Sequence, residues 1–372
     1  MAIFGFLTST KGITLPIIKE QFNINYTNSG LILFFSSIGY LSATFITGFL
    51  ISKYGFKKVL IGAFSVSILA AVVFFVSKSY VFVVLGYYLL GFSFGLFEVS
   101  VNSLAVKIFI RNIVVLMNLT HLFYGVGAAI GPSYSSFIIK SGFNWSYIYL
   151  FFIIVLVLSI AAILPVTFPE PDATGGGSIL VNFKALLHNR KIWMFVLLLG
   201  FIMSIEMGLS SWLVNYLSVI KLITIEKGSV YLTLFFAFLT LGRLISGFIA
   251  AKIGHIRIIF IYLSGLIVSV LLGMLLSSTY AILFSAAGFF ISIFFPNIMV
   301  IISHEFKENT SQVIGTIITF AAIIGMLSVF IIGKANDLIG VGFGLCLVIV
   351  YGLISLTFLS ILSKKHLTHK QD

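Results

Sequence analysis

A carboxylate and an amide lie inside one long apolar run. Glu98 is the only charged residue in LLGFSFGLFEVSVNSLAV (Leu89–Val106), and Asn102 follows four residues later. On a helix, residues four apart project to the same side. Carboxylates and amides accept and donate hydrogen bonds at fixed positions, which is the chemistry that holds a ligand rich in hydroxyl groups. A carboxylate can also take up and release a proton, because its charge state follows its hydration and its neighbours.

A second pair of polar residues follows in the next apolar run. Asn118 and His121 are spaced i, i+3, so they share one helix face. With Glu98 and Asn102, they predict four polar groups converging on one cavity. The alternative is that Glu98 never titrates and is a structural hydrogen-bonding residue, paired with Lys11 or His121. Because a charge at bilayer depth costs roughly 2.5–3.5 kcal/mol on insertion scales, we favour the functional reading, proton coupling at Glu98.

The later part of the chain carries a second carboxylate of this kind. Glu206 shares its helix face with Ser210, and Trp212 and Asn215 follow in SIEMGLSSWLVNYL. These residues are predicted to contact the ligand, with Glu206 as a second proton-coupling group. The flat indole of Trp212 suits the C–H face of a sugar ring, but it equally suits an interfacial aromatic belt. Arg243 in the next run offers Glu206 a structural ion pair.

The composition requires a lipid environment around these residues. Hydrophobic residues make up 60% of the 372, and charged residues only 9%. Such a chain cannot bury its apolar surface in one water-soluble core, so we expect the lipid bilayer as its partner. The net charge of +12 comes from cations between apolar runs rather than from a basic patch with interleaved aromatics, so nucleic-acid binding is not expected. With one cysteine and no metal-ligand or catalytic motif, we expect neither metal nor cofactor nor an enzyme.

The apolar runs predict an all-α membrane protein with twelve transmembrane helices in two six-helix bundles. A span needs roughly 20 helical residues. Twelve runs approach this length, at about 2–18, 28–51, 59–77, 80–106, 113–138, 147–165, 192–217, 230–251, 258–277, 280–303, 313–333 and 342–363. The first is short for a span, which leaves open whether Met1 is the true start or lies inside the first helix. We expect an N-terminal bundle at 1–168, a polar, Gly-rich cytoplasmic linker at 169–191 and a C-terminal bundle with a short tail at 192–372.

The distribution of Lys and Arg predicts the orientation. If the segment after the second run is inside, the inside segments hold fourteen of these cations and the outside segments six, with Lys11 and Arg243 inside spans. Cytoplasmic segments carry such an excess. Both termini are therefore expected in the cytoplasm, with the protein in the cell (plasma or inner) membrane as a monomer.

The two halves contain an internal repeat. TFITGFLISKYG (Thr44–Gly55) ends the second run, and RLISGFIAAKIG (Arg243–Gly254) ends the eighth, with Gly-Phe, Lys and Gly at a constant offset. Together with six spans on each side of a polar linker, the repeat is typical of transporters built from two parallel-related halves with the ligand site between them.

These features resemble the major facilitator superfamily. GFLISKYGFKK (Gly48–Lys58) is similar to that superfamily's short loop signature, Gly-x-x-x-Asp-x-x-Gly-Arg-Arg/Lys, although Ser52 and Phe56 stand where the signature has Asp and Arg. The resemblance implies a structural role for four residues of this loop: Gly48, Gly55, Lys57 and Lys58. The charged contact that the loop normally makes with a neighbouring helix is not implied.

Within the superfamily, the chain resembles the fucose permease and bacterial glucose/mannose–proton symporter group. Four stretches carry this likeness: GITLPIIKEQFNINYTNSGLI (12–32), GLFEVSVNSL (95–104), MNLTHLFYGVGAAIGP (117–132) and FFPNIMVI (294–301). The last stretch implies Asn297 as a further substrate contact. The fucose permease has an Asp late in its first span, where this chain has Gly12 beside Lys11, so a relay of two carboxylates in the first half is not carried over.

The resulting expectation is proton-coupled uptake of a monosaccharide or similar small polar solute by alternating access. The alternative is a proton-driven drug or metabolite efflux antiporter, because Gly127, Gly131 and Pro132 match part of that group's signature in the fifth span. Small residues there also permit close helix packing in any such carrier. A sensor without transport activity is disfavoured, because the chain has no sizeable soluble domain.

Overall fold

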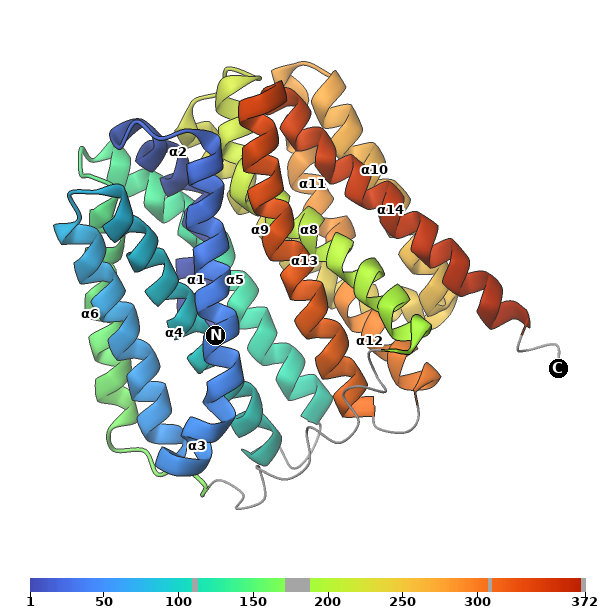
Figure 1. Ribbon diagram of the computed structural model, residues 1–372, viewed down its shortest axis with the longest axis horizontal. Coiled ribbons are helices and arrows are strands. Elements are labelled where there is room, and N and C mark those ends of the chain that lie inside the picture. Colours follow the sequence, from blue (N-terminus) through green and yellow to red (C-terminus); the bar gives the residue numbers. More distant parts are fainter. Residues whose placement is uncertain (109–112, 171–187, 307–309, 369–372) are drawn as a thin grey trace. The chain divides into compact units, whose positions relative to one another are not determined.

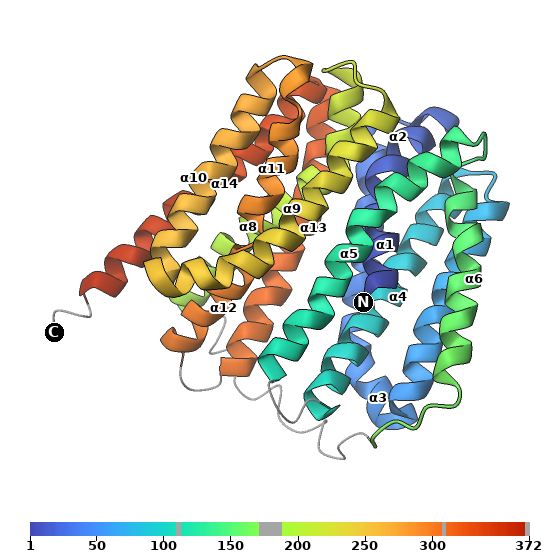
Figure 2. The same ribbon diagram turned by 180° about the vertical axis from the view of Figure 1, so that it is seen from behind.

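The structure is a computed structural model that describes residues 1–108, 113–170, 188–306 and 310–368. Most of these residues are helical, and none of them forms a strand (Figures 1 and 2). Two compact units divide the chain, Met1–Ser178 and Ile179–Asp372, and each is described by itself. The predicted linker falls largely on residues outside the described ranges, so the predicted domain boundaries remain predictions.

Unit 1 is a bundle of hydrophobic helices. Its helices are α1 (Ala2–Ser9), α2 (Lys11–Gln21), α3 (Tyr26–Val76), α4 (Tyr80–Ile108), α5 (Ile113–Lys140) and α6 (Ser146–Ile163). The side chain of Asn25 caps α3 by accepting a hydrogen bond from the backbone N–H of Asn28 at 2.8 Å. The N-terminus lies part-way along the length of α3, and α1 starts there (Figures 1 and 2).

Unit 2 has the same kind of architecture. Its elements are α8 (Arg190–Val219), α9 (Ile225–Ile253), α10 (His255–Leu275), the 3₁₀ turn η1 (Ser278–Tyr280), α11 (Ile282–Ile291), α12 (Phe294–Glu305), α13 (Thr310–Ile339) and α14 (Val341–Thr368). The tenth predicted run is therefore two helices, α11 and α12, which meet at 292–293.

The internal repeat has a structural counterpart in the backbone. Gly55 has φ 80° and ψ 161°, and Gly254 has φ 90° and ψ 146°. Residues with a Cβ atom rarely adopt such a positive φ, so glycine is the natural choice at both turns. Gly55 bends α3 into two stretches that correspond to the second and third predicted runs, and Gly254 separates α9 from α10 in the same way.

Ten helices of the described chain are long and apolar enough to cross a membrane. The difference from the twelve predicted runs has two sources. Tyr26–Val76 counts once although it contains two runs, and the first run forms α1 and α2, which have only 8 and 11 residues. A multi-pass helical membrane protein is confirmed, and the count of twelve spans remains a prediction.

Candidate substrate and proton site

Close contact between α3 and α4 positions the first carboxylate. A Cβ atom on Gly91 would lie 1.8 Å from the carbonyl oxygen of Ser36, and one on Gly95 would lie 2.5 Å from that of Tyr40. Glycines four residues apart let two helix backbones approach this closely. The approach places the hydroxyl of Tyr40 close to Glu98, so that the two groups interact electrostatically.

An equally close contact brings α1 against α5. A Cβ atom on Gly5 would lie 1.9 Å from the carbonyl oxygen of Tyr124, and one on Gly127 would lie 1.9 Å from that of Ala2. The crossing sets the hydroxyl of Thr8 at 2.8 Å from that of Tyr124, within hydrogen-bond distance. Gly127, with Gly131 one turn later against Ser9, therefore has a packing role in unit 1. This packing accounts for the glycines without an antiporter function.

The two crossings meet in one polar group, which we call the Glu98 cluster: Thr8, Tyr40, Glu98 and Tyr124. All four residues are half-buried, and Tyr124 lies within electrostatic range of Tyr40. The ring of Phe94 stacks between the two phenols, with centroid distances of 5.4 Å to Tyr40 and 5.9 Å to Tyr124. The cluster thus offers one carboxylate and three hydroxyls, all supplied by different helices of unit 1.

Lys11 binds a residue of α3 near the Glu98 cluster and does not pair with Glu98. Its ammonium group donates to the hydroxyl of Ser36 at 2.8 Å. Ser36 lies one helical turn before Tyr40 on α3, so Lys11 and Glu98 each bind a different side chain of the same helix. Of the two partners considered for Glu98 from the sequence, Lys11 is replaced by Tyr40.

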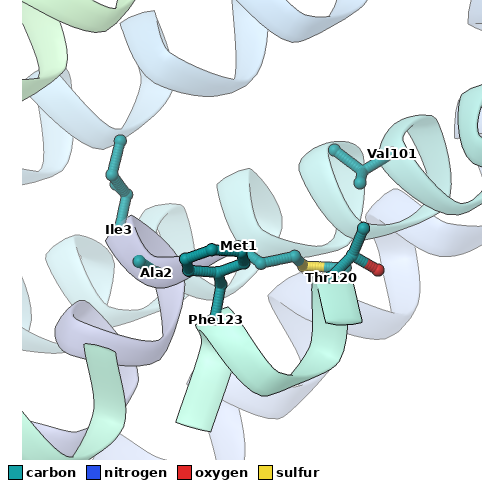
Figure 3. A pocket seen from close by; sticks show the side chains of 6 residues that line it. All are labelled: Met1, Ala2, Ile3, Val101, Thr120 and Phe123. Carbon is teal, nitrogen blue, oxygen red and sulfur yellow. The ribbon is translucent and has the colours of Figure 1, made fainter. Parts of the chain in front are cut away.

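Asn102 lies one turn beyond Glu98 on α4, as predicted. Its side-chain oxygen is buried and has no hydrogen-bond partner among the side chains that the structure describes. The side chains of Asn118 and His121 lie outside that part, so their predicted roles stay predictions. A pocket of about 320 Å³ opens between α1, α4 and α5 (Figure 3). Its lining residues are Met1, Ala2, Ile3, Val101, Thr120 and Phe123.

The second carboxylate, Glu206, has a cationic neighbour in unit 2. It is half-buried on α8, and Arg243 on α9 acts on it electrostatically. This arrangement supports the ion-pair interpretation of Arg243. Ser210, one turn after Glu206, is half-buried and donates to the carbonyl oxygen of Met207 at 3.2 Å.

Trp212 is packed inside unit 2 rather than exposed on a cavity wall. It is 2% exposed, and its indole N–H donates to the carbonyl oxygen of Val329 on α13 at 3.2 Å. A packing role is therefore better supported than either the predicted substrate contact or the aromatic belt. Asn215 is also buried, and its side-chain nitrogen has no partner among the described residues.

Asn297 connects two elements of unit 2. Its side-chain oxygen lies 2.5 Å from Nδ1 of His255, the first residue of α10, and its nitrogen donates to the carbonyl oxygen of Ile293 at 2.9 Å. These contacts join the α11–α12 break to the start of α10. Both polar atoms of Asn297 have partners within the protein, and its predicted substrate contact stays a prediction.

The loop at Gly55 makes contacts other than the charged contact that is typical of the superfamily's loop signature. Lys57 donates to the carbonyl oxygen of Leu164 just after α6. Phe56, in place of the signature's Arg, is 2% exposed, and the ammonium group of Lys107 lies 5.7 Å from its ring centroid. A cation–π contact thus occupies a place where the signature has charged residues. Lys58 is exposed, and Gly48 faces open space.

The comparisons with known proteins agree with this architecture. The family model of the Major Facilitator Superfamily matches residues 1–329, and the chain belongs to this superfamily of membrane transporters. It is accordingly a transporter and not an enzyme.

Similarity to individual proteins extends over most of the chain. The glucose/mannose transporter GlcP of Bacillus subtilis is 25% identical over 350 residues, covering 88% of this chain and 84% of its own. Solved structures with the same fold include a bacterial homologue of the human lysosomal transporter Spinster (TM-score 0.78, 13% identity, 99% and 95% of the two chains). They also include the Escherichia coli fucose:proton symporter FucP (TM-score 0.67, 18% identity, 97% and 96%).

Sequence spacing missed three members of the Glu98 cluster, namely Thr8, Tyr40 and Tyr124. Spacing along one helix identifies neighbours such as Asn102, but it cannot identify partners on other helices. A signal was present in the glycines, because Gly91 and Gly95 directly precede Glu98 and mark the helix face that a second backbone approaches.

Proposed function

We propose that this transporter carries out proton-coupled uptake of a monosaccharide or similar small polar solute by alternating access. The observation that carries the proposal is the position of Glu98 within a half-buried group of hydroxyls, where two close helix crossings bring together Thr8, Tyr40 and Tyr124. An ionisable residue inside a membrane segment is retained against a cost, and such residues mark substrate or ion pathways and proton relays.

The chemistry of the Glu98 cluster fits both parts of this function, which are binding of the solute and transfer of a proton. The hydroxyls of Thr8, Tyr40 and Tyr124 donate and accept hydrogen bonds, as the hydroxyls of a sugar do. Water favours the ionised form of a carboxyl group, and a dry site favours the protonated form. A carrier that alternately opens to each side changes the hydration of Glu98 in every cycle, so Glu98 takes a proton on one side and releases it on the other.

The similar proteins support a sugar as the solute. GlcP is described as a glucose/mannose transporter, FucP as a fucose:proton symporter and another structural neighbour as a D-xylose–proton symporter. None of these likenesses exceeds 25% identity, so they support the solute class rather than a particular sugar. Asn102 lies one turn from Glu98 and is the best-placed amide for a further hydrogen bond to such a solute.

The proposal includes a topology. The chain has twelve spans if α3 counts as two spans that meet at Gly55 and α1 and α2 together count as one. With an even number of spans, both termini lie on the same side, and the distribution of Lys and Arg places that side in the cytoplasm. The protein acts as a monomer in the cell membrane. Labelling of single cysteines introduced at Lys78 and Lys140 tests the orientation, because both must react from outside in intact cells.

Uptake into proteoliposomes tests the function. We expect at least one sugar of a radiolabelled panel to accumulate when the outside is made acidic, and accumulation to stop when a protonophore collapses the gradient. Uptake that ignores the gradient would contradict proton coupling. If no small polar solute is transported, and expression in a pump-deficient strain confers resistance to unrelated drugs, the efflux alternative replaces this proposal.

A further inference from the structure

Lys11 is a cation inside the apolar core of unit 1. It follows Thr10 and precedes Gly12 and Ile13, all of which are buried, and its own side chain is half-buried. A lysine at such a depth is costly unless a negative charge or water compensates it. The question is what supplies that compensation.

The described part of unit 1 provides no carboxylate for Lys11. Its single hydrogen-bond partner there, the hydroxyl of Ser36, is neutral. Three acidic residues occur in this part: Glu20, Glu98 and Glu170. Glu98 binds Tyr40, whereas Glu20 and Glu170 are exposed, and Glu20 is nine residues along α2, roughly 13 Å by the helical rise.

Two separate helices place Lys11 beside the Glu98 cluster. On α3, its partner Ser36 is one turn before Tyr40, and at the α1–α2 junction Lys11 itself is one turn after Thr8. The junction residue Thr10 has helical dihedral angles (φ −63°, ψ −23°), so Thr8 and Lys11 share a face. The ammonium group therefore lies one helical turn from two of the residues whose hydroxyls are proposed to bind the solute, Thr8 and Tyr40.

We propose that the solute carries a carboxylate next to its hydroxyl groups, as a sugar acid does, and that Lys11 binds this carboxylate. The inference rests on the proposed function and specifies its substrate class. One ammonium group balances the single charge of a carboxylate. A phosphate group carries more charge and is usually held by several donors, often the fork of an arginine, which this part of unit 1 lacks.

Matched sugar pairs test this inference. Purified protein in proteoliposomes is assayed for binding and uptake of glucose against glucuronate and galactose against galacturonate, with glucose 6-phosphate as a third arm. The expected result is at least tenfold tighter binding of the acid in one pair. Lys11→Gln should weaken binding of the acid at least tenfold and so remove that preference, whereas Lys11→Arg should retain it.

Lys19→Gln is the matched control, because it removes the same charge from the same helix two turns away, where Lys19 lies 4.3 Å from the ring centroid of Tyr26. It should leave the preference intact. Neutral sugars bound as tightly as the acids would overturn the inference while the proposed function stands. Tighter binding of the phosphate would overturn the choice of a carboxylate. Transport of neither kind of sugar would refute the proposed function itself. If Lys11→Gln does not fold, the wild-type protein still tests the inference, because equal binding of acid and neutral sugar would overturn it. Loss of the preference in a folded Lys11→Arg variant would also count against it.

Discussion

Replacing Gly91 by alanine tests whether the α3–α4 contact builds the site. The added Cβ would lie 1.8 Å from the carbonyl oxygen of Ser36, whereas ordinary contact begins at 3.4 Å, so the two backbones must separate by about 1.6 Å. Overpacking of this kind costs about 1–3 kcal/mol. At about 2–4 °C per kcal/mol for a unit of this size, the midpoint of thermal unfolding should fall by about 2–12 °C.

Gly62→Ala is the control, because Gly62 lies in α3, the partner helix of Gly91, beyond the Gly55 turn, and a Cβ there meets nothing within 4 Å. Alanine should raise stability at this position by about 0.5–1 kcal/mol through helix propensity. Unfolding is followed by tryptophan fluorescence in detergent, and proton-driven uptake is measured in parallel. Equal stability of Gly91→Ala and wild type, or an equal loss in Gly62→Ala, would refute the argument that this crossing positions Tyr40 against Glu98.

Three further results are expected. Trp212→Phe removes the donor to the carbonyl of Val329 and should cost about 0.5–1.5 kcal/mol of stability without changing the KM for the solute; a tenfold rise in KM would restore Trp212 as a substrate contact. Lys191→Met breaks the ion pair with Glu305, whose side chains are 39% and 16% exposed, so the loss in thermal stability should stay below about 1 kcal/mol and shrink in high salt. Asn102→Ala should raise the KM by roughly tenfold with unchanged thermal stability, because its buried oxygen has no partner among the described side chains; an unfolding midpoint that drops while KM holds would make it structural.

The sequence was a good guide to features that depend on local composition. Hydropathy located the apolar helices, since a span must be long and apolar whatever it packs against. The repeat at Gly55 and Gly254 marked two turns that share a backbone conformation in the structure. The first run was the exception, because its residues divide between α1 and α2, neither long enough to count as a span.

Contacts between helices were the part that the sequence could not predict. Tyr40 meets Glu98 because two glycines let α3 and α4 approach, and no spacing within either helix specifies that. The same holds for Trp212 and Asn297, whose polar atoms bind α13 and α10. An amide or indole in an apolar run indicates that a partner exists, but not whether the partner is a solute or another helix.

Glu98→Gln tests the central claim most directly. Glutamine keeps the shape and most hydrogen bonds of the residue but cannot carry a proton. In proteoliposomes, this variant should lose accumulation driven by a pH gradient while it retains exchange of internal for external solute without a gradient. Glu206→Gln is the companion variant, because Glu206 has Arg243 as its electrostatic partner and should be dispensable for coupling. If Glu98→Gln still concentrates the solute and Glu206→Gln does not, the proton site is in unit 2; if both still concentrate it, neither carboxylate couples transport and the account is contradicted.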